Sequence, residues 1–317
     1  MTTTTLAFFF PGQGSQAVGM GKDLAERYPV ARQAFDEADA ALGTKLSQLC
    51  FEGPEDQLRL TENTQPAILT VSVAAWRVLS EKGIKPAFVA GHSLGEYSAH
   101  VAAGTISFTD AVRAVRNRGK YMQEAVPVGT GSMAAIVGMN IDAVTTLCAD
   151  AAQGQVCEPA NINSPDQIVI SGSVAAIERA VKLAGERGAK RAKMLQVSAP
   201  FHCSLMKPAQ ERLAADLDKL NFSAPKVPVV ANVSAQPVED TTAARNALIS
   251  QVTGSVKWNE SIQLLIARGV QTFVEVGPGK VLSGLMRQID RTKKALNVED
   301  EASLQKAMDY LTSPPAA

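Results

Sequence analysis

Histidine and cysteine are scarce in this chain, which has three histidines and four cysteines among 317 residues. No two cysteines form a Cys-x-x-Cys pair, and the histidines do not have the spacing of metal ligands. We therefore expect no catalytic metal. A chain of this length can bury a sufficient core without disulfides, so we expect free thiols, as is usual in the reducing cytoplasm.

Neither sign of charge is in excess, because 31 lysines and arginines balance 31 aspartates and glutamates. Nucleic-acid-binding proteins are usually basic, so this balance argues against a nucleic-acid partner, and it provides no attraction to an anionic membrane. Long apolar runs are also missing. The first one ends at Pro11 and no basic residue precedes it, so we expect neither a signal peptide nor a transmembrane helix. These features predict a cytoplasmic protein with no nucleic-acid or membrane partner.

The sequence near the start matches only part of a nucleotide-binding motif. Gly12-Gln13-Gly14-Ser15-Gln16-Ala17 fits the dinucleotide pattern G-x-G-x-x-G/A after a strand. That motif requires a second strand, ending in an acidic residue about 20 positions later. The corresponding sequence, ARQAFDEADAAL, is typical of a helix. We therefore expect no nucleotide cofactor, and nothing else in the sequence indicates a cofactor.

Strands and helices alternate along most of the chain, which is typical of an α/β fold. The patterns predict strands near residues 6–10, 87–90, 227–233 and 272–276 and helices near 25–42, 64–82, 95–103, 109–124, 243–250, 258–268, 281–289 and 303–311. Between them the order changes to β-α-β-β-α-β, with strands at 133–137, 156–162, 168–171 and 193–197 and helices at 142–152 and 174–187. That order is typical of a ferredoxin-like unit. We predict a large α/β domain (residues 1–128 and 199–317) with an inserted small domain (residues 129–198).

The most informative motif is Gly91-His92-Ser93-Leu94-Gly95, which fits G-x-S-x-G. An apolar strand is predicted before it and a helix of small residues after it, so Ser93 would lie on a sharp turn with its Oγ exposed. The amide of Leu94 and the helix N-terminus could then stabilise an oxyanion. The alternative is an ordinary strand-to-helix turn made of small residues.

A nucleophilic serine needs a base, and elimination leaves His202. His92 is adjacent to Ser93 and should point away from it, as a packed histidine, whereas His100 lies two helical turns further on. Acids between Ser93 and His202 fall mostly in helices or turns of the predicted insertion, so we favour a Ser–His dyad oriented by a main-chain carbonyl over a triad. Cys203 is a weaker rival nucleophile, because adjacent residues of an extended segment point in opposite directions.

Arg118 stands out on the predicted helix 109–124, because it shares the apolar face with Ala111, Val115 and Met122. An unpaired charge on such a face is costly. Arg118 therefore either pairs with a buried acid or binds the carboxylate of a ligand, which a guanidinium can hold through two hydrogen bonds. A basic cluster at residues 187–193 is either a solvated helix end or a contact for an acidic partner.

The motifs, taken together and in order, resemble one family. They are Phe10-Pro11-Gly12-Gln13-Gly14-Ser15-Gln16, Thr64-Gln65-Pro66-Ala67, Gly91-His92-Ser93-Leu94-Gly95-Glu96, Arg118-Gly119-Lys120, Asn161-Ile162-Asn163-Ser164-Pro165, Pro200-Phe201-His202 and Glu275-Val276-Gly277-Pro278-Gly279. From about residue 6 to 295 the chain resembles the malonyl-CoA:acyl-carrier-protein transacylases of bacterial fatty-acid synthesis. The resemblance implies an α/β-hydrolase-like large domain with a ferredoxin-like insertion, and malonyl-CoA and acyl carrier protein as partners.

The resemblance also implies roles for individual residues. Ser93 would be the nucleophile and His202 the base, with the amides of Gln13 and Leu94 forming the oxyanion hole. Arg118 would bind the free carboxylate of the malonyl group, and the main-chain carbonyl of Gln251 would orient the histidine. Three alternatives stay open: a serine hydrolase or thioesterase of the same fold, a malonyltransferase of polyketide synthesis, and a non-catalytic scaffold that binds the carrier.

Overall fold

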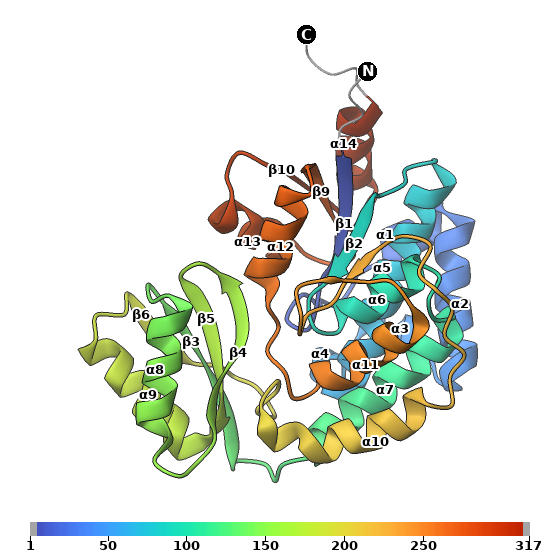
Figure 1. Ribbon diagram of the computed structural model, residues 1–317. Coiled ribbons are helices and arrows are strands. Elements are labelled where there is room, and N and C mark those ends of the chain that lie inside the picture. Colours follow the sequence, from blue (N-terminus) through green and yellow to red (C-terminus); the bar gives the residue numbers. More distant parts are fainter. Residues whose placement is uncertain (1–4, 313–317) are drawn as a thin grey trace.

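The computed structural model describes residues 5–312 and contains two β-sheets (Figure 1). The larger sheet has the strand order β10-β9-β1-β2-β7-β8. Its strands are β1 (Thr5–Phe10), β2 (Phe88–Gly91), β7 (Val229–Val230), β8 (Pro237–Val238), β9 (Val270–Val276) and β10 (Lys294–Val298). All neighbours pair in parallel except β7 and β8. The carboxyl ends of β1 and β2 therefore meet at one edge.

Strand β1 is buried on both faces, which explains its uninterrupted apolar sequence. Phe8 and Phe10 belong to the core formed with the helices of one face, whereas Ala7 and Phe9 pack in a separate core with Trp258 and its neighbours. The helices of the large part are α1 (Lys22–Arg27), α2 (Pro29–Leu42), α3 (Leu46–Glu52), α4 (Glu55–Leu58), α5 (Thr61–Glu81), α6 (Gly95–Ala102), α7 (Phe108–Glu124), α10 (Lys207–Leu217), α11 (Thr241–Gln251), α12 (Trp258–Ala267), α13 (Val281–Ile289) and α14 (Glu301–Thr312).

The smaller sheet is antiparallel throughout, with the order β4-β5-β3-β6. Its elements are β3 (Gly131–Val137), α8 (Ile141–Ala152), β4 (Cys157–Ser164), β5 (Gln167–Ser173), α9 (Val174–Glu186) and β6 (Arg191–Met194). One face of the sheet packs against α8 and α9, which lie on its outer side in Figure 1. This order and packing confirm the predicted α/β fold with a ferredoxin-like unit.

Strand β4 connects the smaller sheet to the large part. Ile162 donates its amide hydrogen to the carbonyl of Val256 (2.9 Å), and Val256 donates to the carbonyl of Ala160 (2.8 Å). The side chains of Met133 and Val169, on the face away from α8 and α9, belong to the core cluster of the large part. That face is therefore turned toward the large part. The domain limits at residues 129 and 198 stay a prediction.

Several element boundaries differ from the sequence predictions. The helix expected at 25–42 is two helices, because Tyr28 adopts an extended conformation immediately before Pro29. Helix α7 begins one residue earlier than expected, and its N-cap is the Ser107 hydroxyl, which accepts a hydrogen bond from the Asp110 amide. Helix α10 and strand β10 were not anticipated, and β7 is much shorter than the apolar run 227–233. No helix within residues 5–312 is long and apolar enough to cross a bilayer.

Candidate active site

Ser93 lies on the sharp turn between β2 and α6, and its φ of 50° is in the left-handed region that non-glycine residues rarely adopt. Two neighbouring glycines make the turn possible. A Cβ on Gly91 would come within 1.9 Å of the Gly95 carbonyl group, and a Cβ on Gly95 would lie 2.0 Å from the carbonyl oxygen of Phe10. Both glycines of G-x-S-x-G are therefore required by close backbone contacts. The turn places Ser93 in the wall of a cavity.

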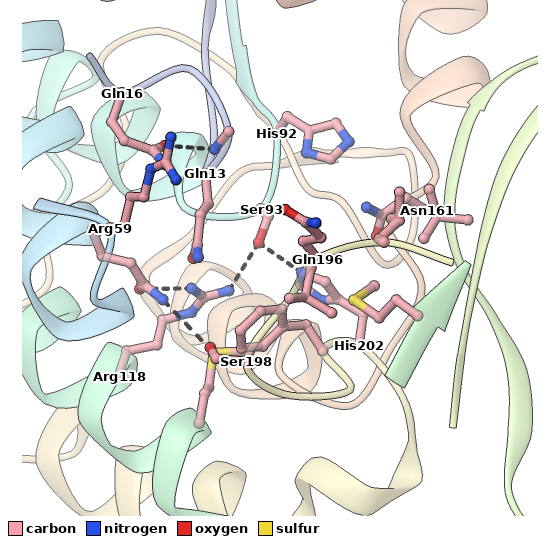
Figure 2. A pocket seen from close by; sticks show the side chains of 18 of the residues that line it. Gln13, Gln16, Arg59, His92, Ser93, Arg118, Asn161, Gln196, Ser198 and His202 are labelled. Carbon is pink, nitrogen blue, oxygen red and sulfur yellow. Dashed lines mark hydrogen bonds between the residues drawn. The ribbon is translucent and has the colours of Figure 1, made fainter. Parts of the chain in front are cut away.

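His202 is the histidine that contacts Ser93, with 2.7 Å between its Nε2 and Ser93 Oγ (Figure 2). Its Nδ1 lies 2.8 Å from the main-chain oxygen of Gln251. Since a carbonyl can only accept, Nδ1 carries the proton and Nε2 is free to accept from the serine hydroxyl. Burial lowers the pKa of His202 to about 3, and the charge of Arg118 acts in the same direction. The imidazole is therefore neutral near pH 7, as a base must be.

Arg118 is 1% exposed and reaches the nucleophile from α7. One terminal nitrogen donates to Ser93 Oγ (3.1 Å) and to Gln251 Oε1 (2.8 Å), and the other donates to Gln65 Oε1 (2.7 Å). Its helix can approach α5 closely because a Cβ on Gly119 would lie 2.6 Å from the carbonyl oxygen of Thr61. Within residues 5–312 no carboxylate forms an ion pair with Arg118. The charge has only uncharged hydrogen-bond partners, which leaves it available to an anionic ligand.

The main-chain amides around Ser93 differ in whether a protein group already accepts their hydrogen. The Ser93 amide is already used, because it donates to Asn232 Oδ1 at 2.7 Å. The amides of Gln13 and Leu94 donate to no protein acceptor within the part of the chain that the structure describes. Gln13 lies beside Ser93 in Figure 2, since the loop after β1 packs on the turn, where a Cβ on Gly12 would be 2.4 Å from the His92 carbonyl oxygen. Their role as an oxyanion hole stays a prediction.

The site opens into a cavity of about 550 Å³ between the two sheets. Gln13, Arg118 and Met122 line it from the large part, and Met133 and Val169 line it from the smaller sheet. The segment 195–198, Phe201 and His202 form a further part of the wall. A volume of this size is typical of small-molecule and cofactor sites, and the mixed lining suits a ligand with an apolar chain and a few polar groups.

The other candidate residues lie away from the reacting atoms. His92 Nε2 is 2.8 Å from Asn163 Oδ1, with its ring against Trp258, and His100 is fully buried beside Glu96, at 4.0 Å. Cys203 is buried and donates its Sγ hydrogen to the carbonyl of Pro200 (3.2 Å). In the basic cluster, Arg187 and Lys190 form ion pairs with Asp150 (2.6 Å) and Asp166 (3.6 Å), as at a solvated helix end.

Sequence reasoning assigned no role to three polar side chains next to the site. Gln65 and Glu96 stand in the motifs that carry the resemblance, whereas Asn232 was missed altogether. Gln251 was named only for its main-chain carbonyl, but its side chain also donates to the Ser93 carbonyl (2.8 Å) and to Glu96 Oε2 (2.7 Å). Asn232 could have been suspected, because it is a polar residue just after a strand at the sheet edge where ligands bind in α/β folds.

Comparisons with known proteins show which family the chain belongs to. Residues 7–308 match the acyl transferase domain family. The malonyl CoA-acyl carrier protein transacylase of Salmonella typhimurium is 51% identical over 306 residues, which cover 96% of this chain and 99% of that protein. The solved structure of the malonyl CoA-acyl carrier protein transacylase of Coxiella burnetii superposes with a TM-score of 0.96 at 44% identity, covering 98% and 99% of the two chains.

A third relative was solved as a malonyl-transacylase in complex with its type II polyketide acyl-carrier protein. It has a TM-score of 0.95 and 48% identity, and the alignment covers 97% of this chain and 100% of that one. Identity near 50% over almost the full length, together with a matching fold, shows the family of this chain. The chain belongs to the malonyl CoA-acyl carrier protein transacylases.

Proposed function

We propose that this chain transfers a malonyl group from malonyl-CoA to the phosphopantetheine thiol of an acyl carrier protein, through a malonyl ester of Ser93. The observation that carries the proposal is the position of Arg118, a buried cation that forms no ion pair within residues 5–312 and whose nitrogen lies 3.1 Å from Ser93 Oγ. A substrate with a free carboxylate near its thioester would place that carboxylate on Arg118 while Ser93 reaches the carbonyl carbon.

In the first half-reaction, Ser93 Oγ attacks the thioester carbon while its proton moves to His202 Nε2, 2.7 Å away. The negative charge on the carbonyl oxygen is stabilised by the amides of Leu94 and Gln13. The carbon–sulfur bond then breaks, and the leaving sulfur of CoA takes the proton from His202. The products are malonyl-Ser93 and CoA thiol, with His202 neutral again.

In the second half-reaction, the thiol of the carrier protein takes the place of CoA. Its proton moves to His202 as its sulfur attacks the ester carbon, and Ser93 Oγ leaves and recovers the proton. Both halves exchange an oxygen ester and a thioester at one carbon, so the same groups serve in both directions. The Gln251 carbonyl, 2.8 Å from His202 Nδ1, stabilises the imidazolium that forms transiently.

Intact-mass measurement with malonyl-CoA tests this function. We expect one malonyl group on Ser93, which disappears when the carrier protein is added and reappears as malonyl-carrier. Ser93→Ala should take up no label. Rapid multiple turnover to free malonate without carrier would instead identify a hydrolase, and the absence of any adduct on the unmodified chain would favour a scaffold that only binds the carrier.

The pathway is a further part of the proposal. The motifs resemble the enzymes of bacterial fatty-acid synthesis, and we propose that the acceptor is the carrier protein of that pathway in the cytoplasm. One relative forms a complex with a polyketide carrier. Equal amounts of a fatty-acid and a polyketide carrier, offered together, would decide between them through the ratio of malonylated products.

A further inference from the structure

The side chain of Asn232 joins the two ends of the strained turn. Asn232 follows β7 and is 1% exposed. Its Oδ1 accepts from the Ser93 amide at 2.7 Å, and its Nδ2 donates to the Gly91 carbonyl at 2.7 Å. One carboxamide therefore spans from the residue before His92 to the residue after it. Strand β7 brings it there because β7 pairs with β2.

The two backbone groups fix the orientation of this amide. An N–H can only donate and a carbonyl can only accept, so Oδ1 must face Ser93 and Nδ2 must face Gly91. The main chain of Asn232 is held as well, because its amide donates to Glu96 Oε2 (3.1 Å) and its carbonyl accepts from the Lys257 amide (2.9 Å). The bridge is thus a fixed part of the fold and not a rotating surface side chain.

This bridge has consequences for the nucleophile. A φ of 50° is unfavourable for serine and persists only where the surroundings hold it. The turn sets the direction of Ser93 Oγ toward His202, at 2.7 Å. Because Asn232 takes up the Ser93 amide, an oxyanion can be stabilised only by other donors, such as the amide of Leu94.

We propose that Asn232 is a positioning residue, which holds Ser93 in its left-handed conformation so that Oγ points at His202. Its effect on malonyl transfer rests on the function proposed above, whereas its effect on the reactivity of Ser93 does not. Without the bridge, Ser93 can relax toward an ordinary conformation and Oγ moves away from the base. Substrate binding, which depends on Arg118 and the cavity, should change little.

Asn232→Asp provides a test in which pH switches the bridge on and off. A protonated aspartic acid has one acceptor and one donor, so it can reproduce both hydrogen bonds of asparagine. An ionised aspartate has only acceptors, so it cannot donate a hydrogen bond to the Gly91 carbonyl and places a carboxylate oxygen against it. We expect kcat about a hundred-fold below the unmodified enzyme at pH 8, the loss typical of a misplaced reacting group, with KM nearly unchanged. At pH 5.5 kcat should recover most of that loss.

The other titratable groups around position 232 do not prevent a comparison between pH 5.5 and pH 8. Glu96 contacts Asn232 directly from α6, whereas Arg118 is linked to it through Gln251 and His202 through Ser93. His202 stays neutral at pH 5.5, because burial lowers its pKa to about 3. Glu96 titrates in both enzymes, so the rates are compared as the ratio of variant to unmodified enzyme at each pH. A change in that ratio therefore reports on position 232.

Three further measurements make the result decisive. The first is the rate at which a fluorophosphonate labels Ser93. This labelling needs no malonyl-CoA, so it tests the effect of Asn232 on the reactivity of Ser93 even if the proposed function is wrong. Asn232→Ala removes the bridge without adding a charge, and its kcat and labelling rate should be low at every pH. Asn140→Asp is the matched control, because Asn140 caps α8 through the Ala143 amide and aspartate caps equally well.

Recovery of kcat and labelling at low pH in Asn232→Asp, with none in Asn232→Ala, would support the inference. Wild-type kcat and labelling in folded Asn232→Ala would overturn it, even if Asn232→Asp failed to fold at pH 8. An equal, pH-independent loss in both variants would also overturn it. If the unmodified chain transfers no malonyl group, only the proposed function is refuted.

Discussion

Replacing Arg118 with alanine should change the choice of substrate more than any other single substitution. Arg118 donates to Gln65, Ser93 and Gln251, all of them uncharged, and it is 1% exposed. In the proposed complex it holds the malonyl carboxylate. The variant would leave that carboxylate buried without a positive partner, whereas an acetyl group has no carboxylate to satisfy.

The size of the effect follows from the burial. Breaking a buried ion pair by removing one partner costs about 3–5 kcal/mol, or roughly 150- to 5,000-fold in kcat/KM for malonyl-CoA. Loss of the hydrogen bonds to Ser93 and Gln251 should slow both substrates by a common factor. The ratio of kcat/KM for malonyl-CoA to that for acetyl-CoA cancels this factor, so we expect the ratio itself to fall by at least about a hundred-fold.

Single-turnover acylation followed by intact mass gives both rate constants without the carrier protein. Arg116→Ala is the matched control, because Arg116 lies on the same helix with its side chain 31% exposed and 4.0 Å from Glu62. Arg118→Lys keeps the charge but loses the planar fork of the guanidinium. Its ratio of malonyl-CoA to acetyl-CoA acylation should therefore lie between the ratios of Arg118→Ala and Arg116→Ala. An equal loss for malonyl-CoA and acetyl-CoA in Arg118→Ala would show that Arg118 only maintains the structure, and the proposed carboxylate contact would be wrong.

Three other predictions concern pH and packing. For malonyl-CoA, kcat/KM should stay level from pH 8 to about 5, because burial lowers the pKa of His202 to about 3. The acidic limb of kcat should lie at a higher pH than that of kcat/KM, since a bound carboxylate offsets the charge of Arg118. A fall of kcat/KM with a midpoint near pH 6.5 would contradict this. Burial raises the pKa of Glu96 to about 7 from 4.5, so the folded state binds more protons than the unfolded one between these values and stability falls as pH rises through them. Glu96→Gln should therefore raise the free energy of unfolding by up to about 3 kcal/mol at pH 8 and by much less at pH 4.5, measured by urea denaturation; equal effects at both pH values would contradict the assignment. Gly91→Ala should cost at least about 1–3 kcal/mol and abolish acylation, because its Cβ would lie 1.9 Å from the backbone of Gly95, and a variant with normal Tm and acylation would refute this reading of the turn.

Local patterns predicted the parts of the site that are local in the chain. The turn around Ser93 requires small residues within five positions, and the face of α7 that carries Arg118 follows from helical spacing alone. His202, whose contact with Ser93 Oγ the structure shows, was reached by elimination, which was possible because the chain has only three histidines. The order of strands and helices along the insertion also followed from the sequence, but in the sheet only β4 and β5 pair as a hairpin of neighbours, whereas β3 pairs with β5 and β6 across helices.

The sequence by itself thus determined the α/β order, the serine turn, the buried arginine and, through the resemblance of its motifs, the family. Only the tertiary structure decided what holds the nucleophile. Asn232 contacts Ser93 across 139 positions of the chain and Gln251 contacts it across 158. No periodicity encodes such contacts, because they depend on which strands become neighbours. That the hydrogen-bond partners of Arg118 within residues 5–312 are all uncharged is for the same reason a property of the folded chain.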